Sequence, residues 1–220
     1  GGGGLASGLS EMFKILSPQT KIVGVEPKGA PSMSTSIQNK KNMELEEIEN
    51  FVDGAAVKRV GDLTFNIARQ NLHEMITVDE GLICQTILDL YNKEAIVAEP
   101  AAALSIAALE YYKEEIKDKN VVCIISGSNN DITRTAEISE RAMLYADLKH
   151  YFIVNFPQRA GALRQFVEQI LGPNDDITYF QYTKKTNRQT GSAVVGLEIK
   201  SISDFDPLIK RMKEQNFYGD

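Results

Sequence analysis

The chain begins with GGGGLASGLSEMFKIL (residues 1–16) and continues into KIVGVEP (residues 21–27). In the first segment the apolar side chains recur at helical spacing, at Leu5, Leu9, Met12, Phe13 and Leu16. Ser17-Pro18 ends the predicted helix, and the β-rich run that follows predicts a strand. A glycine loop, a helix and a strand therefore come in succession, which is the order of elements in an α/β sheet.

The four glycines at the start favour a phosphate-binding loop. Glycine lets successive backbone N–H groups turn towards an anion and approach it closely, and the N-terminus of the following helix adds partial positive charge. The alternative is a flexible linker, because polyglycine is also a common spacer. The helix and strand that follow at once favour the first interpretation. Five residues are therefore candidates for anion binding: Gly1, Gly2, Gly3, Gly4 and Leu5.

A second run predicts a buried strand that ends in polar residues. VVCIIS (residues 121–126) is apolar and mostly β-branched, which is typical of a central strand covered on both faces. Because ligands of open α/β sheets bind outside the carboxyl ends of the strands, Ser126 could present its hydroxyl to a ligand. An ordinary turn or helix N-cap at the end of the strand is the alternative.

Two carboxylates stand at the ends of short strands, each directly before a proline. They are Glu26 in GVEP and Glu99 in AEPAAA. Both could face the mouth of a pocket, and the alternative is that both are solvated groups that end their strands. Asp79 is predicted to cap the helix that follows it, because its side chain can accept from the first free N–H groups of a helix.

The pattern changes near residue 148. The segments after it predict, in order, a strand, a helix, two strands and a helix: 150–156, 160–171, 176–184, 192–200 and 202–215. This β-α-β-β-α order is the ferredoxin-like α+β arrangement less one strand. We therefore expect two domains, an α/β domain over residues 1–148 and an α+β domain over residues 149–220 whose last strand is incomplete.

Composition excludes several classes of partner. The net charge is −6, with 15 Lys+Arg against 22 Asp+Glu in residues 1–150 and 9 against 8 in residues 151–220. Neither part has the basic face that nucleic acid requires, and no apolar run approaches the roughly 20 residues that span a bilayer. Cys84 and Cys123 are predicted to be buried free thiols, which fits a reducing, cytoplasmic compartment.

Taken together, these motifs resemble the fold-type II pyridoxal-phosphate enzymes and, within them, the threonine dehydratases. GGGGL (1–5) is similar to the phosphate loop of that family, and VGVEP (23–27) to the strand after its first helix. DGAAVKRVG (53–61) is similar to a segment typical of the biosynthetic enzymes. Three further segments follow in the family's order: ITVDEGLI (76–83), AEPAAA (98–103) and IISGSN (124–129).

The resemblance implies pyridoxal 5'-phosphate as the cofactor. Residues Gly1–Leu5 would hold its phosphate, and Ser126 would bond its pyridine nitrogen. A hydroxyl at that position does not hold the nitrogen protonated, which favours elimination. Glu26 and Ala30 match positions of a divalent-cation site in related racemases, but Ser32 stands where a second acid is expected, so no metal is assigned.

The last domain resembles the ACT-like regulatory domain of the threonine dehydratases. FPQRAGALRQFVEQIL (156–171) followed by DITYFQYTK (176–184) carries this resemblance, although Ala160 replaces the proline of many ACT domains. It implies end-product inhibition by isoleucine, with valine as a further effector, and a homo-oligomer, by family a tetramer. The loop Pro157–Leu163 is where we would look for the effector. A purely structural oligomerisation module is the alternative.

The implied reaction converts L-threonine to 2-oxobutanoate and ammonia, the first step of isoleucine biosynthesis. The family's Schiff-base lysine lies in a Ser-x-Lys-x-Arg-Gly motif upstream of the glycine loop, and no lysine of this chain stands in that context. No catalytic residue is therefore assigned here, and residues 1–220 alone are expected to be inactive and poorly stable. A serine dehydratase or racemase of the same fold and a non-catalytic amino-acid-binding fragment are the alternatives.

Overall fold

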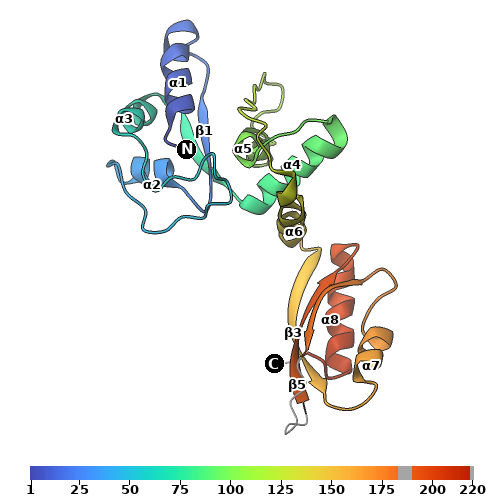
Figure 1. Ribbon diagram of the computed structural model, residues 1–220. Helices are drawn as coiled ribbons and strands as arrows, with labels where there is room; N and C mark the ends of the chain where they lie inside the picture. Colours follow the sequence, from blue (N-terminus) through green and yellow to red (C-terminus); the bar gives the residue numbers. More distant parts are fainter. Residues whose placement is uncertain (183–189, 219–220) are drawn as a thin grey trace. The chain divides into compact units, whose positions relative to one another are not determined.

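The computed structural model describes residues 1–182 and 190–218 and divides into two compact units, Gly1–Ala142 and Met143–Asp220 (Figure 1). The first unit contains helices α1 (Gly4–Leu16), α2 (Ser32–Gln38), α3 (Asp62–Asn71), α4 (Glu80–Glu94) and α5 (Pro100–Ala107), strands β1 (Val23–Pro27) and β2 (Glu74–Val78), and 3-10 turns η1 (Ala108–Tyr112) and η2 (Ile132–Arg134). Helix α6 (Thr135–Tyr145) crosses the boundary between the units.

Strands β1 and β2 pair in parallel, with Val23 opposite Glu74 and Pro27 opposite Val78. Parallel strands need a long crossover connection, which is usually helical, and here it contains α2 and α3. Helix α1 packs against α3, where the Ser7 hydroxyl lies 3.2 Å from the Thr64 carbonyl oxygen. The α/β class expected for this part of the chain is confirmed.

A common core joins β2 with the helices α4, α5 and α6. Its buried members include Val78, Ile83, Leu104 and Ile138, which come from these four elements in turn. The helix starts follow the sequence. Asp79 caps α4 by accepting a hydrogen bond from the Gly81 N–H at 3.0 Å, as expected, and Pro100 occupies the first turn of α5.

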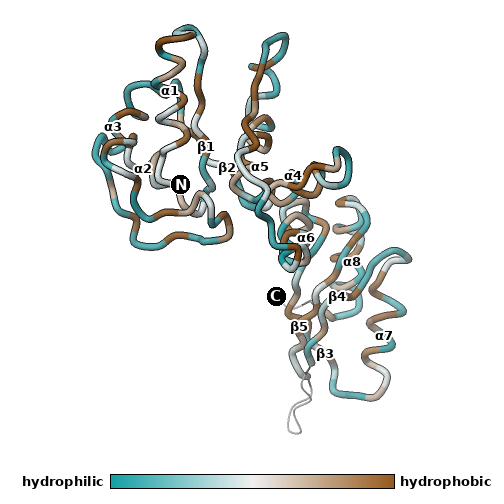
Figure 2. Tube along the Cα trace, turned by 45° about the horizontal axis from the view of Figure 1, so that its top comes forward, coloured by the Kyte–Doolittle hydropathy of each residue, from teal (hydrophilic) through white to brown (hydrophobic). Residues whose placement is uncertain are grey.

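The second unit is an antiparallel sheet covered by two helices. Strands β3 (Lys149–Pro157), β5 (Thr190–Glu198) and β4 (Asp176–Tyr182) lie in the order β3-β5-β4, with α7 (Ala162–Gln169), η3 (Ile202–Asp204) and α8 (Phe205–Glu214) as the remaining elements. Figure 2 shows hydrophobic and hydrophilic residues alternating along α7 and α8. Their apolar sides pack on alternate residues of β5, and the predicted β-α-β-β-α order is confirmed.

The predicted central strand at residues 121–126 is wrong. Residues 120–131 form neither helix nor strand, and the Val122 side chain is 87% exposed. A strand exists through hydrogen bonds to a neighbouring strand, and in the described residues none pairs with this run. Its carbonyl groups bond elsewhere instead: Ile124 accepts from the Ser105 hydroxyl at 2.9 Å.

Two further expectations concern thiols and membranes. Cys84 is a buried free thiol, as expected, whereas Cys123 is only half-buried because the run around it is exposed. Among the helices that the structure describes, none has the length and apolar character that crossing a membrane requires.

Candidate functional site

The glycine loop leads directly into the first helix. Gly3 adopts φ +90°, a left-handed conformation that favours glycine, and α1 begins at the next residue. The Ser7 N–H donates to the Gly3 carbonyl at 2.9 Å, which is the first helical hydrogen bond. The N–H groups of Gly4, Leu5 and Ala6 therefore have no acceptor within the helix. The loop presents free backbone donors at the positive end of a 13-residue helix.

The surroundings of this helix end suit an anion. No side chain caps α1, and its first turn contains no acidic residue. A Cβ added to Gly2 or Gly4 would meet nothing within 4 Å, so both glycines border open space. Free N–H donors, helix polarity and unfilled space together fit a phosphate group such as that of pyridoxal phosphate.

Neighbouring segments fix the other side of the loop. The Gly2 carbonyl accepts hydrogen bonds from the Thr64 hydroxyl and, at 3.3 Å, from the Gly61 N–H. A Cβ on Gly1 would lie 3.0 Å from the Gly54 carbonyl oxygen. The segment DGAAVKRVG, which the sequence singled out, therefore borders the glycine loop at both of its ends.

Gly54 also links the glycine loop to the segment after residue 125. A Cβ on Gly54 would lie 3.4 Å from the Glu99 carboxylate, and a Cβ on Gly127 would lie 2.5 Å from the same carboxylate. The Glu99 N–H donates to the Gly127 carbonyl at 3.2 Å. The structure thus brings together three segments that are far apart in the sequence, around Gly1, Gly54 and Gly127.

Ser126 lies beside this junction with its side chain exposed. Its hydroxyl makes no hydrogen bond to any other part of the chain that the structure describes, so it is available to a ligand. It does not stand at the carboxyl end of a strand, contrary to expectation, because residues 120–131 form no strand.

Glu26 is buried, with an exposed fraction of 5%, and is not a solvated strand end. Its carboxylate accepts hydrogen bonds from the Met33 N–H, at 2.7 and 3.1 Å, and from the Ser34 N–H at 3.2 Å, so it caps the start of α2. Burial raises its pKa to about 7, and these backbone bonds oppose the rise. Glu99, the second carboxylate, is half-buried over Gly127.

The metal-site positions serve structural roles. The Ser32 hydroxyl donates to the Val57 carbonyl, and the side chain is 1% exposed. The described ranges, 1–182 and 190–218, contain no group of three or more His, Cys, Asp or Glu side chains arranged to hold a metal ion.

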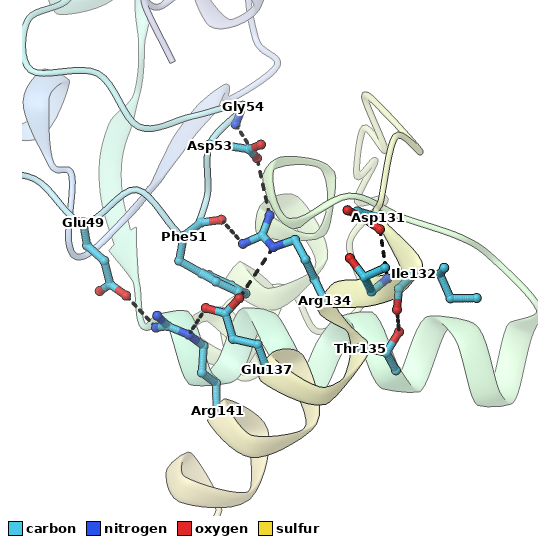
Figure 3. A network of polar contacts seen from close by, with 11 residues as sticks. Glu49, Phe51, Asp53, Gly54, Asp131, Ile132, Arg134, Thr135, Glu137 and Arg141 are labelled. Carbon is cyan, nitrogen blue, oxygen red and sulfur yellow. Dashed lines mark hydrogen bonds and ion pairs between the residues drawn. The ribbon is translucent and has the colours of Figure 1, made fainter.

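Two arginines near the site had not been identified from the sequence. Arg134, at the end of η2, and Arg141, in α6, both project onto the segment 49–54, which ends at Gly54 (Figure 3). Glu137 lies between them and pairs with both, at 3.6 Å from Arg134 and 3.0 Å from Arg141. Arg134, Glu137 and Arg141 are three, four and seven residues apart, a spacing that places side chains on one face of a helix. This spacing was the signal in the sequence that could have identified them.

In the second unit, the loop between β3 and α7 is a tight turn. Gly161 has φ +80° and precedes α7, and the Ala162 N–H faces the Arg159 carbonyl at 3.5 Å. A Cβ on Gly161 would meet nothing within 4 Å, so the loop is open at this position.

Comparison with known families matches both units. Residues 1–127 match the family described as pyridoxal-phosphate-dependent enzyme, and residues 140–219 match the C-terminal regulatory domain of threonine dehydratase.

Individual relatives agree with these matches. The biosynthetic L-threonine dehydratase of Staphylococcus aureus is 57% identical over 219 residues, which are 99% of this chain and 51% of that protein. The corresponding protein of Halalkalibacterium halodurans is 53% identical over 217 residues, which are 99% of this chain and 52% of that protein. The chain thus spans about half the length of the curated relatives it matches.

Solved structures share the fold. Threonine deaminase isoform 2 from Solanum lycopersicum is 38% identical, with a TM-score of 0.62 over 66% of this chain and 40% of that chain. Serine racemase from Dictyostelium discoideum is 33% identical, with a TM-score of 0.55 over 60% of this chain and 42% of that chain. Since the family match covers more than half of its residues, the chain belongs to the pyridoxal-phosphate-dependent enzymes, and it carries the regulatory domain of the threonine dehydratases.

Proposed function

We propose that the protein containing this chain converts L-threonine to 2-oxobutanoate and ammonia with pyridoxal 5'-phosphate. The observation that carries the proposal is the glycine loop: free N–H groups at the start of α1, bordered by open space at Gly2 and Gly4. Its occurrence in one chain with a match to the threonine dehydratase regulatory domain supports threonine as the substrate.

In this proposal, the backbone of Gly1–Leu5 holds the cofactor phosphate. The Ser126 hydroxyl binds the pyridine nitrogen, and as a neutral group it does not force that nitrogen to stay protonated. The cofactor, when bound, supplies an electron sink that makes the proton on the α-carbon of the amino acid more acidic. In this proposal residues 1–220 bind and orient the cofactor, and a lysine outside these residues attaches it covalently.

The second unit is proposed to bind an amino-acid effector and to regulate the first. Isoleucine is the first candidate and valine the second, at the open loop Pro157–Leu163. We further propose a homo-oligomer, a tetramer by analogy with the family, working in the cytoplasm on a small-molecule substrate.

A second candidate function is the dehydration or racemisation of serine. The similarity to serine racemase from Dictyostelium discoideum favours it. Substrate preference distinguishes the two functions. It is measured by comparing the rate at which 2-oxobutanoate forms from threonine with the rate at which pyruvate or D-serine forms from L-serine. Inhibition by isoleucine would favour the threonine enzyme. Preferred turnover of serine would favour the serine enzyme and contradict the first proposal.

The phosphate loop is tested by paired alanine substitutions in a protein that contains residues 1–220 in full. Gly4→Ala and Gly8→Ala both place a methyl group where nothing lies within 4 Å, and both replace a glycine of α1. We expect Gly4→Ala to weaken the binding of pyridoxal phosphate at least about tenfold, because the methyl group enters the anion site. Gly8→Ala, one turn further along, should bind like the wild type.

Equilibrium dialysis against pyridoxal phosphate and against pyridoxal, which lacks the phosphate, provides the measurement. The preference for the phosphorylated compound should fall in Gly4→Ala and persist in Gly8→Ala. Equal effects of the two substitutions, or no preference in the wild type, would place the phosphate elsewhere.

A further inference from the structure

The segment Glu49–Gly54 separates the glycine loop from helix α6. At one end of it, the Gly54 carbonyl oxygen lies 3.0 Å from the position of a Cβ on Gly1. Residues 45–54 contain neither helix nor strand, and Gly54 lies in a turn that the Ala55 and Ala56 N–H groups close by donating to the Val52 carbonyl at 2.9 and 2.8 Å. The turn fixes the local backbone, and side chains that reach the segment from outside hold the turn in its place beside the glycine loop.

Arg134 makes three different contacts with this segment (Figure 3). Its Nη2 donates to the Phe51 carbonyl at 2.8 Å, and its Nη1 lies 3.9 Å from the Asp53 carboxylate. Its guanidinium also stacks on the Phe51 ring, 4.8 Å from the centroid. Asp53 in turn accepts from the Gly54 N–H at 2.9 Å. A chain of contacts thus runs from Arg134 through Asp53 to Gly54.

Arg141 holds the other end of the segment. Its guanidinium lies 4.3 Å from the centroid of the Phe51 ring, and its Nη1 pairs with Glu49. The Phe51 ring is thus in contact with two guanidinium groups, and its side chain is buried, with an exposed fraction of 4%. The side chains of Arg134 and Arg141 are 25% and 32% exposed, so their contacts with the buried Phe51 are less weakened by solvent than those of surface pairs.

We propose that Arg134 is a positioning residue for the glycine loop, acting through Phe51, Asp53 and Gly54. Lysine cannot replace it, because only the planar guanidinium can stack on a ring while donating along two directions. The inference rests on the proposed function in one respect: the anion on the glycine loop is taken to be the cofactor phosphate.

The position of Arg134 is itself fixed by the core of the first unit. It ends η2 and is followed at once by α6, which belongs to the core that contains Phe51 and Val52.

The first test is hydrogen exchange without cofactor in a protein that contains residues 1–220 in full. In Arg134→Lys we expect exchange to rise about tenfold in residues 51–55 and also in residues 7–10, as for the loss of one charged hydrogen bond. The Ser7 N–H is the first in α1 to be hydrogen-bonded within the helix, so protection of the loop end of α1 is measured from this residue on. Arg164→Lys is the matched control, because Arg164 is 81% exposed and its partner Glu168 is also exposed. Faster exchange in 51–55 with no change in 7–10 would overturn the proposal, as would no change in either.

A second variant keeps the test decisive if Arg134→Lys loosens the whole first unit, visible as faster exchange in α4. Asp53→Asn removes one ion pair and leaves the Phe51 contacts in place, and the Asp53 side chain is 74% exposed. It should raise exchange in residues 7–10 while α4 stays protected. Unchanged exchange in residues 7–10 would overturn the proposed route from Arg134 through Asp53 to the glycine loop.

The second readout is the preference for pyridoxal phosphate over pyridoxal. Arg134→Lys should lower this preference several-fold, with the affinity for pyridoxal and the melting temperature close to those of Arg164→Lys. A general structural defect would lower both affinities together and would overturn the positioning role. A wild type with no preference would refute the phosphate site itself, and the exchange data would then still decide whether Arg134 positions the loop.

Discussion

The Cε atom of Met33 lies 2.7 Å from the position that a Cβ on Gly3 would occupy, and the Cβ of Thr64 lies 3.0 Å from it. Gly3 also has φ +90°, a backbone conformation that residues with a Cβ rarely adopt. Helices α2 and α3, which contain Met33 and Thr64, therefore pack against the glycine loop at Gly3.

From this packing we predict that Gly3→Ala lowers the free energy of unfolding of the first unit by about 1–3 kcal/mol. The midpoint of urea denaturation measures the change. Gly8→Ala, where nothing lies within 4 Å, should instead be neutral or stabilising by up to about 1 kcal/mol, since alanine favours a helix. Equal stability of the two variants would contradict the packing described at Gly3.

The second prediction concerns Glu26, whose pKa rises from the ordinary 4.5 to about 7 on burial. Between these values the folded protein keeps a proton that the unfolded chain has lost. The contribution to stability is therefore present below about pH 4.5 and is lost as pH rises through 7. A shift of 7 − 4.5 = 2.5 pH units corresponds to about 3 kcal/mol as an upper value.

Glu26→Gln keeps an acceptor for the Met33 N–H and removes the titration. Urea denaturation at a series of pH values should show a shallower loss of stability between pH 4.5 and 7 in this variant than in the wild type. Burial also raises the pKa of Glu80, so part of the slope should remain. Identical slopes would mean that folding does not raise the pKa of Glu26.

The two thiols should differ in reactivity. Burial raises the pKa of both thiols, that of Cys84 to about 12, but Cys84 is fully buried whereas Cys123 is only half-buried. Because the reagent must reach the thiolate, iodoacetamide should modify Cys123 in the folded protein and both thiols in urea. Cys123→Ser should leave no reactive thiol under native conditions. Rapid labelling of Cys84 in that variant would show that the core around α4 opens easily.

In the second unit, Gly196 is covered by a pair of tyrosines. A Cβ there would lie 2.9 Å from both Tyr151 Cε1 and Tyr179 Cβ, and the two rings meet edge to face at 6.1 Å. Gly196→Ala should therefore lower the free energy of unfolding of this unit by about 1–3 kcal/mol. Ser192→Ala, at an exposed position of β5, serves as the control and should change it by less than about 0.5 kcal/mol. A neutral Gly196→Ala would mean that the tyrosines move aside freely.

Local patterns in the sequence predicted most of the fold. The helix over Leu5–Leu16, the Asp79 cap and the three strands of the second unit were each predicted from a few neighbouring residues, and all are found in the structure. The run at 121–126 failed for the opposite reason. Its apolar character is local, but a strand also needs a neighbour to pair with, and composition contains no information about that neighbour.

The candidate site was predictable only in part. Gly1–Leu5 stood out because glycine has a conformational meaning by itself. The contacts among Gly1, Gly54 and Gly127 join segments more than 50 residues apart, which no local pattern reveals. The sequence analysis did not single out Arg134, and only the structure shows that it reaches the Phe51 carbonyl.

The pairing of β1 with β2 has a consequence for the order of folding. It joins residues 74 − 23 = 51 positions apart, whereas β4 and β5 bring together Tyr182 and Ala193, which are 193 − 182 = 11 apart. Closing a longer stretch of chain loses more entropy before any contact compensates for it, so sheets of distant partners form more slowly. We therefore expect the paired ends of β4 and β5 to gain exchange protection first in a pulse-labelled refolding reaction. Pairing of β1 with β2 should follow later, as should pairing of β3 with β5, whose partners Lys149 and Glu198 are 198 − 149 = 49 positions apart.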